Sequence, residues 1–109
     1  MGHDLAVDSP APKPDVDLPA IRDGIDDVDR RLVTLLAERG RLVRQVVHYK
    51  RAHHMPVVDR GREDDMLARI AETAREAGLD PRVAQQVLRT IIDGFTLLEA
   101  EELGPDHIA

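Results

Sequence analysis

The 109-residue sequence contains no cysteine and no tryptophan, and its aromatic residues are limited to Tyr49 and Phe95. Without cysteine there is no disulfide framework and no thiolate metal site, which agrees with a cytoplasmic protein. With so few aromatic rings, the core has to be built from Leu, Val, Ile and Ala. No apolar run approaches the roughly 20 residues of a membrane span, and no signal-peptide pattern opens the chain. We therefore expect one modest domain that does not insert into a membrane.

Charge is distributed unevenly along the chain, whose formal net charge is −6. Residues 30–62 carry nine Lys or Arg against two acids, whereas the remaining residues carry six against nineteen. The middle of the chain can therefore attract an anion although the whole molecule is acidic. From charge alone the candidate anions are a nucleic acid and a small polycarboxylate.

A long helix is predicted from about Pro19 to about His53, because apolar residues recur there in steps of three and four. Pro56 ends this stretch, since the residue before a proline is disfavoured in a helix. At about 1.5 Å per residue the helix would be roughly 50 Å long, too long for one compact chain of this size. We expect its overhang to pack on a second copy, as an antiparallel homodimer. The apolar series comprises Ile21, Ile25, Val28, Leu32, Leu35, Leu42 and Val46.

Two shorter helices are predicted after the connection. Asp59 is a cap for a helix over about residues 60–77, and Gly78 suits its end. Asp80 and Pro81 open a third helix that ends near Glu102. No alternating strand pattern occurs, so the fold class is all-α with three helices, one long and two shorter. The proline-rich residues 1–18 and residues 104–109 are interpreted as tails around a domain over 19–103. Expected apolar stripes are Met66, Leu67, Ile70 and Ala74, then Val83, Val87, Leu88, Ile91, Ile92, Phe95 and Leu98.

Charged residues interrupt two of these apolar faces. Arg39 falls within the long helix's apolar series, and Lys50 follows eleven residues later on nearly the same face. A guanidinium in a core seam is costly unless an anion meets it. Glu99 lies on the apolar face of the third helix, where it must be paired or protonated, and Lys50 would satisfy it. The alternatives are a salt bridge to another helix for Arg39 and a solvated helix end for Lys50.

Other chemical signals are weak or absent. Arg62 in the first turn of the second helix is slightly disfavoured by the helix dipole, which favours a functional reason for it. The neighbouring residues His53 and His54 point in different directions with no acid nearby in sequence, so no metal site is predicted. No catalytic Ser/His/Asp set, phosphate loop or nucleotide fingerprint occurs. We expect no cofactor.

Three motifs together resemble a known family. They are I-D-x-x-D-x-x-L-x-x-L-L-x-x-R, which ends at Arg39, the lysine eleven residues later, and P-V-x-D-x-x-R-E over residues 56–63. From about Leu18 to Leu103 the chain is similar to the all-helical chorismate mutases, the AroQ type. The resemblance implies an intertwined homodimer with two equivalent active sites. It also implies the pericyclic rearrangement of chorismate to prephenate in aromatic amino-acid biosynthesis, a reaction that needs no cofactor.

The resemblance implies a role for each matching residue. Arg39 and Arg22 would each grip a substrate carboxylate, with Arg22 supplied by the partner subunit and Arg62 at the carboxylate end. Lys50 and Glu99 would donate to the ether oxygen. The catalytic residues are then Lys50, Glu99 and Arg39, the substrate-binding set is Arg22, Arg39, Lys50, Asp59, Arg62, Glu63, Thr96 and Glu99, and Val46, Met66 and Ile92 form apolar walls.

Two departures from the family leave alternatives open. Glu99 stands where bacterial members commonly have Gln, so it must be protonated to donate to the ether oxygen. Phe95 stands where some members have a small hydroxyl residue, which Thr96 next door could replace. A related substrate is therefore an alternative, either isochorismate with pyruvate elimination or 4-amino-4-deoxychorismate with rearrangement.

Two readings outside simple catalysis also remain. One is a non-catalytic regulatory or nucleic-acid-binding helical dimer, which the seam position of Arg39 argues against, so no nucleic-acid partner is expected. The other is a mutase activated by docking on another shikimate-pathway enzyme through residues 103–109.

Overall fold

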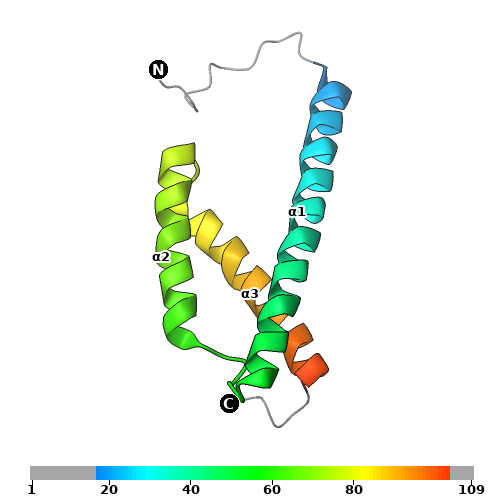
Figure 1. Cartoon of the computed structure of the whole chain (residues 1–109). Coiled ribbons are helices and arrows are strands. Elements are labelled where there is room, and N and C mark those ends of the chain that lie inside the picture. The colour runs from blue at the N-terminus through cyan, green and yellow to red at the C-terminus, as the bar shows by residue number, and fades with distance from the viewer. Residues whose placement is uncertain (1–16, 104–109) are drawn as a thin grey trace.

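Three α-helices joined by two short connections make up the chain in a computed structural model, which describes residues 17–103 (Figure 1). They are α1 (Leu18–Ala52), α2 (Arg60–Ala77) and α3 (Pro81–Leu103). Each boundary lies within a residue or so of its predicted position, and no strand occurs within residues 17–103. The predicted tails, apart from residues 17 and 18, lie outside the described residues. None of the three helices is long and apolar enough to cross a membrane.

Local signals set the helix ends. Asp17 is the N-cap residue of α1 and a proline occupies its first turn. The Asp59 side chain caps α2 by accepting a hydrogen bond from the backbone N–H of Arg62 at 3.0 Å. Gly78 ends α2 in the left-handed conformation at φ 77°, which glycine adopts without a Cβ clash. Asp80 accepts from the backbone N–H of Arg82 at the start of α3.

The third helix holds the fold together, because α3 packs against both α2 and α1. In Figure 1, α3 crosses from the C-terminal end of α2 to the C-terminal half of α1, and the other half of α1 stands apart from both helices. The principal extents of 58 × 27 × 17 Å reflect that projection. The core is small and lies where the helices meet; its members, each at most 5% exposed, are Val47, Val57, Ala71, Ala74 and Ile92.

The apolar face of α1 that the periodicity predicted to be buried is exposed in the single chain. Ile21, Ile25, Val28, Leu32 and Leu35 are each between 44% and 60% exposed. Periodicity shows which side of a helix is apolar but does not show what covers it. Among residues 17–103, only α3 comes near this half of α1, at Leu32 and Leu35, so most of the apolar face is left without cover by the described helices.

Candidate active site

A cavity of about 290 Å³ lies between the three helices, and each helix contributes one side of it. The α1 side repeats at helical spacing, with Arg39, Leu42, Val46 and Lys50 on one face. The other sides come from the start of α2 and the C-terminal half of α3. Seven of the eight predicted substrate-binding residues line this cavity, as do the three predicted apolar walls: Arg39, Lys50, Asp59, Arg62, Glu63, Thr96 and Glu99, with Val46, Met66 and Ile92.

The eighth residue, Arg22, does not line the cavity. Its side chain is exposed on the N-terminal half of α1. It lies seventeen residues before Arg39, or about 25 Å along the helix axis. Within one chain the two arginines therefore cannot hold the same small ligand.

Arg39 is half-buried beside the cavity and has no acidic ion-pair partner among residues 17–103. Its Nη2 lies 3.9 Å from the sulfur of Met66, and its Cζ lies 5.1 Å from the ring centroid of Phe95. Burial lowers the pKa of Arg39, the positive charge of Arg62 lowers it further, and the charge of Glu99 opposes this. An arginine stays charged despite such shifts. The inter-helix ion pairs of residues 17–103 do not include Arg39, so the alternative of a salt bridge from Arg39 to another helix is not what the structure shows.

Lys50 and Glu99 face one another across the α1–α3 contact. The Lys50 Nζ donates to the backbone carbonyl of Val57 at 2.6 Å and to the Glu99 Oε2 at 3.3 Å. The two side chains are only 12% and 11% exposed. The prediction that Lys50 satisfies Glu99 is confirmed, and the solvated helix end proposed as the alternative for Lys50 is wrong.

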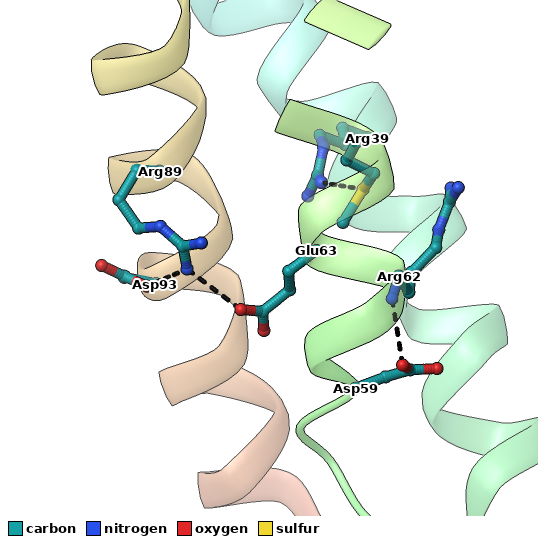
Figure 2. A network of polar contacts seen from close by, with 7 residues as sticks. Arg39, Asp59, Arg62, Glu63, Arg89 and Asp93 are labelled. Carbon is teal, nitrogen blue, oxygen red and sulfur yellow. Dashed lines mark hydrogen bonds and ion pairs between the residues drawn. The ribbon is translucent and has the colours of Figure 1, made fainter. Parts of the chain in front are cut away.

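Asp59 and Arg62 lie at the start of α2, at the edge of the cavity. Asp59 uses one carboxylate oxygen as the helix cap, and its side chain also lines the cavity. The Arg62 guanidinium extends away from that cap, as Figure 2 shows. Among residues 17–103 it has no carboxylate oxygen within 4 Å. Arg39 and Arg62 thus bring two uncompensated positive charges to one cavity.

Glu63 is held by Arg89, which with its neighbour Asp93 was missed by sequence reasoning. Its Oε1 accepts a hydrogen bond from Nη1 of Arg89 on α3 at 3.0 Å, and that guanidinium also lies 3.4 Å from the Oδ1 of Asp93 (Figure 2). The hydrogen bond to Glu63 is the main cause that raises the pKa of Arg89. The i, i+4 spacing of Arg89 and Asp93 is visible in the sequence, but their partner on α2 depends on how the two helices pack.

Phe95 occupies space that a side chain at Gly40 would otherwise need. A Cβ added to Gly40 would lie 3.2 Å from Cε1 of the ring, closer than an ordinary van der Waals contact. Thr96, the proposed substitute for a missing hydroxyl, is half-buried and lines the same cavity. On α3, Phe95 therefore presents its aromatic face to Arg39. The next residue, Thr96, gives the cavity a hydroxyl-bearing side chain.

This geometry can bind a small anion with more than one carboxylate. Two guanidinium groups lack an acidic partner in the described part of the chain, and the walls between them are apolar. At the other end of the cavity, Lys50, Thr96 and Glu99 can form hydrogen bonds with a second part of the ligand. Within residues 17–103 no cluster of side chains could hold a metal ion.

The fold is three helices around a cavity that carries two guanidinium groups. Comparison with known proteins identifies its family. The family model described as chorismate mutase type II matches residues 21–100. Because this match covers most of the chain, the protein belongs to the chorismate mutase type II family. The resemblance drawn from the motifs is confirmed.

Curated relatives agree with that family. The T-protein of Enterobacter agglomerans is 38% identical over 76 residues, which are 70% of this chain and 20% of the T-protein. The bifunctional chorismate mutase/prephenate dehydratase of Escherichia coli is 34% identical over 80 residues, 73% of this chain and 21% of that protein. The chain thus spans about a fifth of these longer relatives. The chorismate mutase of Methanocaldococcus jannaschii is 28% identical over 86 residues, 79% of this chain and 87% of that protein.

The contrast between Arg39 and Lys50 predicts opposite effects on stability. Arg39→Met removes a half-buried charge that has no ion-pair partner among residues 17–103 and whose pKa is lowered mainly by burial, so we expect a higher melting temperature. Lys50→Met removes the ion-pair partner of Glu99, whose side chain is only 11% exposed. We therefore expect the free energy of unfolding to fall by about 3 kcal/mol. Thermal and urea unfolding at one fixed protein concentration check both. A melting temperature lowered equally by both substitutions would contradict the view that Arg39 lacks an internal partner.

Proposed function

We propose that the protein catalyses the rearrangement of chorismate to prephenate in this cavity. The observation that carries the proposal is the uncompensated Arg39 guanidinium beside the Lys50–Glu99 pair, in one partly apolar cavity. Membership of the chorismate mutase type II family supports it, as does the Methanocaldococcus jannaschii relative of nearly the same length that is named a chorismate mutase.

The reaction breaks the ether C–O bond of chorismate and forms a new C–C bond within the same molecule. It needs no nucleophile and no proton transfer, so the protein acts by holding the reactive conformer and stabilising charge on the ether oxygen. Arg39 and Arg62 are placed to bind carboxylates, and Asp59 and Glu63 to accept from the ring hydroxyl. The apolar walls between them exclude water and strengthen each charged contact.

Lys50 is the group best placed to act on the ether oxygen. An ammonium group has three N–H donors, and two of them are used by Val57 and Glu99. The third remains for a ligand in the cavity. The two contacts also fix the ammonium in position before the substrate arrives, so little reorganisation is needed when negative charge develops on the oxygen.

Glu99 has to change its charge state for the role assigned to it. As a carboxylate it accepts from Lys50 and would repel a developing negative charge on the ether oxygen. As a neutral acid it donates a hydrogen bond to that oxygen instead.

A second copy of the chain completes this proposed site. The exposed apolar face of α1 continues into an apolar hollow between α1 and α3, lined by Leu32, Leu35, Leu36, Val87 and Ile91 among others. An antiparallel α1 from a second chain would cover both and bring its Arg22 toward the first chain's Arg39. The dimer therefore accounts for the exposed face and for the distance between the two arginines.

The direct test follows the ultraviolet absorbance of chorismate with the purified chain and identifies the product. We expect loss of chorismate with formation of prephenate. Parallel assays with isochorismate and 4-amino-4-deoxychorismate test the alternatives that Glu99 and Phe95 leave open. No conversion of chorismate, together with turnover of one of the analogues, would move the assignment to that substrate.

If each active site takes Arg39 from one chain and Arg22 from the other, two inactive variants should regain activity when they form mixed dimers. Arg22→Ala and Arg39→Met should each lose nearly all activity. When the two chains are unfolded together and refolded in equal amounts, random pairing makes half of the dimers mixed, and one of the two sites in each is intact. We expect about a quarter of wild-type activity.

The matched control mixes Arg39→Met with the double variant Arg22→Ala/Arg39→Met, in which no site can hold both arginines. This mixture should stay inactive. An Arg22→Ala chain with full activity by itself, or no recovery in the first mixture, would contradict the shared site.

The charge state of Glu99 predicts a pH dependence. The protonated acid is the active form, so activity should decline as the pH rises and Glu99 loses its proton. Glu99→Gln keeps a neutral donor at every pH, so its profile of kcat/KM should be flat on the alkaline side. Superimposable profiles for the wild type and Glu99→Gln would show that Glu99 does not donate as a neutral acid.

A further inference from the structure

We propose that Arg89, which lies outside the cavity, is a positioning residue that holds Glu63 ready for the substrate's hydroxyl group. The inference rests on the proposed function and extends it to a residue of α3 that does not line the cavity. Three observations carry it: the burial of Glu63, the atoms used in its contact with Arg89, and the balance of charge around the cavity.

Glu63 is the one charged residue among residues 17–103 that is buried, at 7% exposure. An ionised carboxylate in such a place is costly unless a counter-charge and hydrogen bonds meet it. Arg89, which lies on α3 and 26 residues further along the chain, provides both the charge and a hydrogen bond, with 3.0 Å between its Nη1 and the Glu63 Oε1. Because α2 and α3 are packed together there, the guanidinium fixes where the carboxylate can lie.

The contact occupies one carboxylate oxygen and leaves the other for a ligand. Arg89 donates to Oε1, and within the described part of the chain no donor is bonded to Oε2. An ionised carboxylate can accept several hydrogen bonds at once. In Figure 2 Glu63 extends from α2 toward Arg89, with Arg39 and Arg62 on its other side.

Charge balance gives Arg89 a second effect on binding. The cavity is lined by three basic residues, Arg39, Lys50 and Arg62, and by the three acids Asp59, Glu63 and Glu99. A dianion entering such a balanced site would meet repulsion from each acid that lacks its own counter-charge. Lys50 faces Glu99, which is neutral in the proposed active form, and Arg89 compensates Glu63 from outside the cavity. Arg39 and Arg62 are then left to bind the substrate.

Asp93 acts on Arg89 from the solvent side. It lies 3.4 Å from the same Nη1 and its side chain is 65% exposed. An exposed pair of this kind contributes little by itself. We therefore place the positioning role in the Glu63–Arg89 contact and not in the Arg89–Asp93 contact.

The test is a double-mutant cycle on the full chain with chorismate as substrate. Arg89→Gln should raise KM by about tenfold, the effect of losing one hydrogen bond between charged groups, with a smaller change in kcat. Arg89→Lys keeps the charge and should recover most of the affinity. In a Glu63→Gln background, Arg89→Gln should change KM by less than about twofold, because Arg89 then has no carboxylate to hold.

Arg75→Gln is the matched control. Arg75 forms a bond of the same length, 3.0 Å, with Glu72 on the exposed side of α2. This variant should keep the wild-type KM. If Arg89→Gln alone does not fold, as judged by circular dichroism, Arg89→Lys and the Glu63→Gln/Arg89→Gln pair, which has no buried uncompensated charge, decide the question.

Two results would overturn the inference while the wild type remains active. One is an unchanged KM for Arg89→Gln, and the other is an equally large rise in KM with and without the Glu63 carboxylate. A wild-type chain that leaves chorismate unconverted is a different outcome, because it removes the proposed function itself.

Discussion

The structure is organised around a guanidinium that has no ion-pair partner within the described helices and their connections. Arg39 sits at the meeting point of three helices, in contact with a thioether and an aromatic ring. Its neighbour Arg62 adds a second charge of the same sign. Such a position costs stability, and a bound anion would offset that cost. This arrangement suits the binding of an anion from solution. The cavity has apolar walls, and the ion pairs Lys50–Glu99 and Glu63–Arg89 lie around it.

Two inter-helix ion pairs hold the cavity open and in register. Lys50 and Glu99 join α1 to α3, and Glu63 and Arg89 join α2 to α3. With only five nearly buried apolar residues in the core, apolar packing alone gives the helices little to define their relative position. Paired charges at low exposure are directional and have few alternative partners. Glu63 and Glu99, two of the three acids that line the cavity, are the ones that these pairs hold in place.

The exposed half of α1 and the absence of Arg22 from the cavity are two consequences of one fact, the length of α1. A helix of 35 residues cannot be covered by helices of 18 and 23 residues when only α3 packs against it, toward its C-terminal half. The same length carries Arg22 away from Arg39. In the proposed dimer one antiparallel copy supplies both the cover for the apolar face and the second arginine, so assembly and substrate binding depend on the same surface.

The helices, their ends and the shared face of Arg39 and Lys50 could be read from the sequence, because prolines, caps, a terminal glycine and a 3.6-residue period act within a few residues. The motifs also led to the family and to seven residues of one cavity. The partners of Glu63 and the position of Phe95 against Gly40 were decided only by tertiary structure. Those contacts join residues far apart in the chain, and they depend on how two helices are rotated and shifted against each other. Local periodicity does not determine that rotation or shift; side-chain packing and paired charges between helices do.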